Sequence, residues 1–174
     1  TSLLTCHLPY IADGSTNGHS ITVNGNTKTE PFAPYDYETY SAVDNGGSSY
    51  TASRSAGRLQ TTTADVNFGT GDYTIEAWCY ITDFSYGPYI VDTRTSSLSE
   101  PAVAFYFNPS AQYQFGVLGV NRITGTDAAI ANQWNHCALV RSGGTTTAYL
   151  NGVSQGTWAD STNYTGSSLT TIGG

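Results

Sequence analysis

The sequence predicts an all-β chain folded as a sandwich of two antiparallel sheets. Short runs alternate apolar with polar residues, and none repeats apolar positions at the three- and four-residue spacing of a helix. The runs end at Gly, Asn or Asp, which are turn residues. With 174 residues, and 13% aromatic against 11% charged residues, the chain can bury a core of its own and is not of the disordered class. One domain spanning residues 1–174 is expected.

The first part of the chain contains two expected strands and a crossing segment. Leu3–Leu8 and Ser20–Val23 are short segments rich in apolar and β-branched residues, so both are predicted as strands. Glu30–Tyr40 contains Pro31 and Pro34, and each proline lacks the N–H that a sheet ladder needs. This stretch is predicted as an extended crossing segment and not as an interior strand.

The central part contains the clearest strand, Tyr73–Ile81. Ile75 and Cys79 point to one face of this run, and Glu76 and Trp78 point to the other. A tryptophan on the second face indicates that both faces are largely covered. Four further strands are expected from the same kind of pattern: Tyr89–Asp92, Val103–Phe107, Gln114–Val120 and Leu169–Ile172.

A three-strand meander is expected near the end of the chain. Its strands are Cys137–Arg141, Thr145–Leu150 and Val153–Trp158. The last two are joined by Asn151-Gly152, which tolerates the positive φ angles of a type I′ turn. The spacing of these hairpins is typical of a sandwich.

Charge and hydropathy exclude two classes of partner. The net charge is -7, and the six cationic residues are scattered singly along the chain. No basic stripe is present to bind a phosphate backbone, so nucleic acid is disfavoured. The apolar runs are far shorter than the roughly 20 residues that a bilayer requires, so membrane insertion is disfavoured as well.

The three cysteines are expected to be reduced and mostly buried. Cys6, Cys79 and Cys137 are an odd set without CxxC spacing or a neighbouring His at the spacing of metal ligands. Unpaired cysteine commonly packs as a small apolar residue. A cross-strand bridge between Cys79 and Cys137 remains the alternative.

The sequence offers no pair of catalytic carboxylates. Glycoside cleavage uses two carboxyl groups that face each other across a cleft. Glu76 is the only one of the four glutamates inside a clear strand, and its expected role is that of a polar partner within the sheet. The sequence has no Gly-x-Ser-x-Gly elbow that would supply a nucleophilic serine for His136, so this histidine is interpreted as structural. We therefore expect a protein that is not an enzyme.

Several stretches resemble a known family. Phe68–Trp78, Trp134–Gly143 and Ala148–Gly152 look like the laminin G-like branch of the concanavalin A-like lectin/glucanase superfamily. The opening Leu3–Cys6, together with Asp13–Asn17 and Ile21–Gly25, resembles the subgroup found in structural proteins of marine bacteriophages. The resemblance covers most of the chain and implies a jelly-roll sandwich that binds glycans or proteins, usually without catalysis.

The resemblance also carries expectations about biology. It implies a virion domain on a tail fibre, appendage or capsid surface, assembled in the host cytoplasm and then extracellular. Its partner would be a host-surface glycan or a neighbouring virion subunit in an oligomeric assembly. The chain is expected to be part of a longer one, since related domains continue beyond Gly174 into a final strand that pairs with the first. A domain of a secreted bacterial adhesin or lectin is the alternative.

Tyrosines are the expected contact residues for a glycan or a partner. With so few charges, binding would use aromatic rings and neutral hydrogen-bonding groups. Asp92 and Arg94 could form a ligand pair, although an exposed ion pair is favoured. No cofactor is required by the pattern. Calcium is the open alternative, and its candidate ligands are aspartates near turns: Asp13, Asp72, Asp83, Asp127 and Asp160. The tyrosines are Tyr35, Tyr37 and Tyr40 beside the prolines, and Tyr86 and Tyr89 around Gly87-Pro88.

Overall fold

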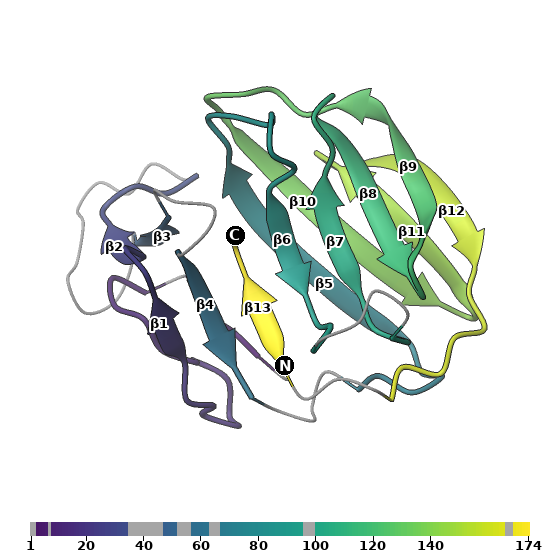
Figure 1. The fold of residues 1–174 in the computed structure, drawn as a ribbon, viewed down its shortest axis with the longest axis horizontal. Coiled ribbons are helices and arrows are strands. Elements are labelled where there is room, and N and C mark those ends of the chain that lie inside the picture. Colours follow the sequence, from purple (N-terminus) through teal and green to yellow (C-terminus); the bar gives the residue numbers. More distant parts are fainter. Residues whose placement is uncertain are drawn as a thin grey trace.

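A computed structural model describes residues 3–6, 8–34, 47–51, 57–62, 67–95, 100–165 and 169–174. Within these ranges the chain forms thirteen β-strands and no α-helix (Figure 1). Every strand pairing is antiparallel. The predicted all-β, two-sheet antiparallel fold is confirmed.

Seven strands form the larger sheet, which lies in front of the other layer in Figure 1. Its order is β1-β4-β13-β6-β7-β8-β9, so the last strand of the chain lies in the sheet interior between β4 and β6. The strands are β1 (Thr22–Asn24), β4 (Arg58–Thr61), β6 (Tyr89–Asp92), β7 (Ala104–Phe107), β8 (Gln112–Val117), β9 (Val120–Ala128) and β13 (Thr170–Ile172).

Four strands form the second sheet, in the order β12-β11-β10-β5, behind β6 to β9 in Figure 1. They are β5 (Tyr73–Tyr80), β10 (Trp134–Ser142), β11 (Thr145–Leu150) and β12 (Val153–Ala159). A separate pair consists of β2 (Lys28–Glu30) and β3 (Ser48–Tyr50). Asn151 and Gly152, with φ angles of 50° and 81°, make the predicted turn between β11 and β12.

The core fills the space between the two sheets. Phe105 and Phe107 on β7 stack on Tyr113 of β8, with ring centroids 5.1 and 4.8 Å apart. These rings are fully buried, as is Leu139 on β10. Because side chains alternate along each strand, the residues between these core positions on β6 to β9 face away from the second sheet. Those outward residues form the outer face of the larger sheet.

Several strand predictions were wrong. The described residues of Leu3–Leu8 form no strand, and Cys6 has a φ of 64°, which interrupts extended backbone. The predicted strand Gln114–Val120 crosses a tight turn at Leu118-Gly119, where β8 ends before β9 begins. β9 was not predicted, because its sequence is polar at most positions. Strands β2, β3 and β4 were also missed.

All three cysteines are free in the structure. Cys137 is fully buried, and Cys6 and Cys79 have intermediate exposure, so the expectation of mostly buried thiols is met completely at Cys137 and in part at the other two. A hydrogen bond with Cys137, together with burial, raises the pKa of the Cys79 thiol. The described ranges contain no helix that could span a membrane.

Candidate functional site

Two rows of outward side chains cross β6, β7, β8 and β9. The pairing register places Tyr89, Tyr106, Gln114 and Thr124 in one row. It places Asp92, Ala104, Gly116 and Asn121 in the next row. The first row has bulky side chains at its centre, whereas the second has a methyl group and a hydrogen atom there. This difference in size creates a depression on the face turned away from the second sheet.

We call this depression the outer-face hollow. Its volume is about 360 Å³, and its floor is Ala104 and Gly116. Tyr89, Tyr106, Arg94 and Asn121 line it, together with the turn from Leu118 to Val120. The rings of Tyr89 and Tyr106 stack across the two strands with their centroids 4.8 Å apart. The hollow thus combines a narrow floor, an aromatic wall and polar groups around the rim.

Arg94 is fixed in place by Asp92. Nε of Arg94 donates to Oδ1 of Asp92 at 2.8 Å, and Nη2 donates to Oδ2 at 2.6 Å. Nη2 also donates to the Tyr89 hydroxyl at 3.0 Å, and the guanidinium carbon lies 5.4 Å from the Tyr89 ring centroid. These bonds to Asp92 raise the pKa of Arg94. The guanidinium is thus held beside the tyrosine wall, and its charge is balanced by Asp92.

A hydrogen-bonded chain orients the opposite side of the hollow. The Tyr106 hydroxyl donates to Oδ1 of Asn121 at 2.8 Å, and Nδ2 of Asn121 donates to Oε1 of Gln114 at 2.8 Å. The buried Gln114 also accepts from the Thr124 hydroxyl. Burial raises the pKa of Tyr106. Because each member has a partner, Tyr106 and Asn121 present fixed groups to whatever enters the hollow.

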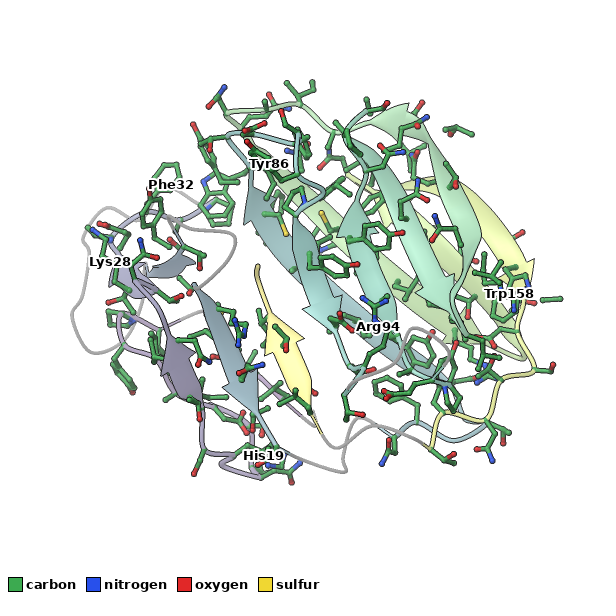
Figure 2. The ribbon with its side chains drawn as sticks, in the orientation of Figure 1. His19, Lys28, Phe32, Tyr86, Arg94 and Trp158 are labelled. Carbon is green, nitrogen blue, oxygen red and sulfur yellow. The ribbon has the colours of Figure 1, made fainter. Side chains whose placement is uncertain are left out.

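The structure brings only part of the predicted contact set to this site. Tyr89 lines the hollow, but it begins β6 and does not lie in a loop. Tyr86 is 63% exposed and does not line the hollow. It lies near the start of β6, whereas Arg94 follows the end of that strand (Figure 2). Tyr35, Tyr37 and Tyr40 lie outside the described residues.

Sequence reasoning missed Tyr106, Asn121, Ala104 and Gly116. Alternation along Val103–Phe107 would have placed Tyr106 on the outer face, but the cross-strand register that brings Asn121 beside it depends on the unpredicted strand β9. The pair of Asp92 and Arg94, expected as exposed, is half-buried: 22% and 15% of their side chains are exposed.

A family model of the concanavalin A-like lectin/glucanases superfamily matches residues 45–174, which is more than half of the chain. The chain belongs to this superfamily. Among curated protein sequences none matches the chain. The superfamily includes both lectins and glucanases, so membership fixes the fold and leaves the activity to the residues of the site.

Solved structures of the superfamily fold give the same architecture at low identity. Domain 4 of AbnA, an extracellular arabinanase of Geobacillus stearothermophilus solved with arabinotriose, is 14% identical (TM-score 0.65; 97% of this chain, 82% of that one). The binding domain of botulinum neurotoxin DC, in complex with SialylT, is 15% identical (TM-score 0.63; 98% and 42%). Domains LG4-5 of the mouse laminin α1 chain are 16% identical (TM-score 0.54; 68% and 32%). The chain thus spans less than half the length of the last two.

The superfamily's glucanases cut glycans, but the hollow lacks their chemistry in this chain. None of its lining residues is a carboxylate. Asp92 accepts from Arg94 with both oxygens, so it is engaged in an ion pair. Glu76, the glutamate considered from the sequence, lies on β5 in the other sheet, 3.6 Å from Nε2 of His136. It therefore cannot act at the hollow.

The aspartates considered as calcium ligands are held by neighbouring donors. Asp72 accepts from the Gly143 N–H, and Asp83 accepts from the Ser85 N–H. Asp127 accepts from the Gln155 amide. In the described ranges no three His, Cys, Asp or Glu side chains are placed to hold a metal ion.

A second hollow, of about 420 Å³, lies where Thr70, Gly144 and Ser161 meet beside Arg141 and Asp160. Its charged groups point into the protein. Arg141 donates to the carbonyl oxygens of Asp160 and Thr162, at 2.7 and 3.0 Å. The carboxylate of Asp160 accepts from Thr146 and Tyr164. These contacts tie loops together, so we interpret this region as structural.

Proposed function

We propose that the chain is a non-enzymatic glycan-binding domain of a bacteriophage virion, carried on a tail fibre, an appendage or the capsid surface. The outer-face hollow is its glycan site. The observation that carries glycan binding is the set of groups around one small floor: two stacked tyrosines, a guanidinium and an amide. Aromatic rings with a few oriented polar groups are the usual means of binding small polar ligands.

The proposal of no enzymatic activity rests on the carboxylates. Hydrolysis needs two carboxyl groups about 5 to 9.5 Å apart across the scissile bond. The described lining of the hollow supplies neither. The superfamily neighbour solved with arabinotriose, a domain of an arabinanase, supports an oligosaccharide as the ligand class.

The virion assignment rests on the resemblance of Leu3–Cys6, Asp13–Asn17 and Ile21–Gly25 to marine phage structural proteins. Free thiols agree with assembly in a reducing cytoplasm before release. The partner is a host-surface glycan. A neighbouring virion subunit is the second candidate, and a bacterial secreted adhesin or lectin is the alternative setting.

Glycan binding is tested with a panel of immobilised glycans and three purified proteins: wild type, Tyr106→Ala and Tyr50→Ala. Tyr50 is an exposed tyrosine on β3 and serves as the matched control. We expect Tyr106→Ala to weaken binding about tenfold or more, because it removes one stacked ring and the donor to Asn121. Tyr50→Ala should bind as wild type does. Equal loss in both variants, or no binding by wild type, would refute the site.

The setting is tested on the parent gene. A virion domain predicts virion genes as neighbours and peptides of this chain in purified particles, found by mass spectrometry. A signal sequence in the parent gene, with no virion genes nearby, would instead establish the adhesin alternative. Incubation of the pure domain with the same glycans should release no reducing ends. Release that is lost in Glu76→Gln would show catalysis.

A further inference from the structure

We infer that the outer-face hollow holds the terminal sugar of a neutral glycan, an inference that rests on the glycan binding proposed above. The size of the hollow is the first observation. A volume of about 360 Å³ lies at the lower end of the range of about 300–1,000 Å³ found for small-molecule sites. Its floor covers only β7 and β8, whose spacing is about 5 Å. This footprint fits one sugar unit better than a chain of them.

The two ends of the hollow are blocked. On one side stand the stacked rings of Tyr89 and Tyr106, in the neighbouring row of the sheet. On the other side is the tight turn at Leu118 and Gly119, whose φ angles are 53° and 73°. The Leu118 N–H donates to the carbonyl oxygen of Glu100 at 3.3 Å, which anchors the turn. A glycan chain therefore cannot pass along the floor in the direction of the strands, and across the strands the row ends at the Asp92–Arg94 pair and at Asn121, so the chain must leave away from the sheet.

The walls also differ in polarity. Leu118, which is 43% exposed, forms an apolar side at the turn. The polar tips of Tyr89, Tyr106 and Arg94 line another part of the hollow. A pyranose has hydroxyl groups at its rim and C–H groups on its faces, so it suits a site with one apolar and one polar wall.

The polar groups retain hydrogen-bonding capacity directed at a ligand. Tyr89 accepts from Arg94, so its own O–H is available to donate. Tyr106 donates to Asn121, so its oxygen is available to accept. Among the described residues, neither Nη1 of Arg94 nor the second N–H of Asn121 has a partner. Donors and an acceptor side by side match hydroxyl groups, which both donate and accept.

The charge arrangement selects against anionic sugars. Arginine binds carboxylates best through the paired edge of Nε and Nη2, and here Asp92 occupies that edge. A second carboxylate would be limited to Nη1, close to Asp92, on a chain whose net charge is -7. The ligand is therefore a neutral sugar and not a uronic or sialic acid.

Calorimetric titration with matched sugars tests this inference. The probes are methyl glycosides of glucose, galactose and mannose, glucuronic and galacturonic acids, sialic acid, and oligosaccharides of two to four units ending in the best hexose. We expect one neutral glycoside to bind, and its uronic acid and sialic acid to bind at least tenfold more weakly. Lengthening the oligosaccharide should change affinity less than threefold.

Gly116→Ala locates that binding. A Cβ at Gly116 would lie 3.4 Å from Oδ1 of Asn121 and 3.6 Å from the Cβ of Ala104, at ordinary contact distance, so the variant should fold and fill the floor. We expect at least a tenfold loss of affinity in Gly116→Ala and in Asn121→Ala. Thr22→Ala, an exposed threonine of the same sheet, is the control and should bind normally. Circular dichroism and thermal melts check folding.

Three results would overturn the inference while the proposed glycan binding stands: preference for an acidic sugar, affinity that rises tenfold or more with oligosaccharide length, or unchanged binding in folded Gly116→Ala. Failure of every monosaccharide, with binding of a panel glycan retained, would also overturn it. Failure of all glycans would refute the proposed function itself.

Discussion

At the scale of single residues, Arg141 and Asp160 form a buried ion pair that is 3% and 1% exposed, with Nε and Oδ2 3.8 Å apart. The carboxylate also accepts from Thr146 and Tyr164 at 2.7 and 2.8 Å. Removing one member of such a pair leaves the other charge buried without compensation. The pair therefore stabilises the arrangement of β10 and the segment after β12 only while both partners are present.

Asp160→Ala should lower the free energy of unfolding by about 3–5 kcal/mol, because Arg141 keeps its charge in the interior and two hydroxyls lose their acceptor. Urea denaturation monitored by fluorescence measures this change. Asp83→Ala is the control, since that exposed aspartate only accepts from Ser85 and should cost less than about 1 kcal/mol. Equal effects of the two substitutions would contradict the role of the buried pair.

Tyr73 makes the stability of the folded chain decrease at alkaline pH. Burial raises its pKa to about 12, above the ordinary value of 10.0. The folded state holds this proton more tightly, so the stabilisation is complete below pH 10 and is lost as the pH rises from 10 to 12. A shift of this size corresponds to roughly 2–3 kcal/mol.

Between pH 8 and pH 12, the free energy of unfolding measured in urea should therefore fall less for Tyr73→Phe than for the wild type. Tyr86→Phe, at an exposed tyrosine, should behave as wild type does. Burial also raises the pKa values of Tyr113 and Tyr164, so part of the pH dependence will remain in Tyr73→Phe. If Tyr73→Phe and wild type lose the same stability, Tyr73 does not titrate differently on folding.

At the scale of strands, Gln155 joins the edges of the two sheets. Its buried side chain, on edge strand β12, accepts from the Asp127 N–H of edge strand β9 at 2.8 Å. Its amide nitrogen donates to the Asp127 carboxylate at 2.9 Å. Arg122 lies over the Trp158 ring near the same junction, 4.9 Å from its centroid. Side chains thus satisfy edge groups that would otherwise be open to pairing with another chain.

Gln155→Leu should cost about 1–3 kcal/mol in unfolding free energy, since the Asp127 N–H and carboxylate lose buried partners. Hydrogen exchange should show the Asp127 amide exchanging faster, with little change in the interior of β7. Ser154→Ala, at the exposed neighbouring position, is the control. Unchanged protection at Asp127 would show that its N–H does not depend on Gln155.

How far sequence predicts these elements depends on the contrast between the two faces of each strand. Tyr89–Asp92 and Thr145–Leu150 were predicted with the bounds that the structure shows, because their patterns are short and bounded by turn residues. β9 was missed because Ile123 is its only fully buried large apolar residue. The strand predicted at Leu3–Leu8 was wrong because apolar content alone does not provide a strand to pair with. The hollow depends on register across four strands, which local pattern does not contain.

At the scale of the whole molecule, the distribution of charge separates the site from the rest of the chain. The chain has 13 acidic and 6 basic residues, so its field repels anions at low salt. In the hollow, Arg94 is neutralised by Asp92, and none of the other lining residues is acidic or basic. Binding there should depend on stacking and hydrogen bonds, which salt screens little.

We therefore expect the affinity for the best neutral glycan to change less than about twofold between 50 and 500 mM NaCl, as measured by calorimetry. The rejection of uronic acids should weaken over the same range, because salt screens the field of the net negative chain and of Asp92. Arg94→Gln separates the two effects. It breaks the ion pair and leaves Asp92 as an uncompensated charge, so it should strengthen the rejection of uronic acids at 50 mM NaCl. A neutral-glycan affinity that falls tenfold with salt would mean that charged groups of the protein contribute to holding the ligand, and binding by stacking and neutral hydrogen bonds alone would be refuted.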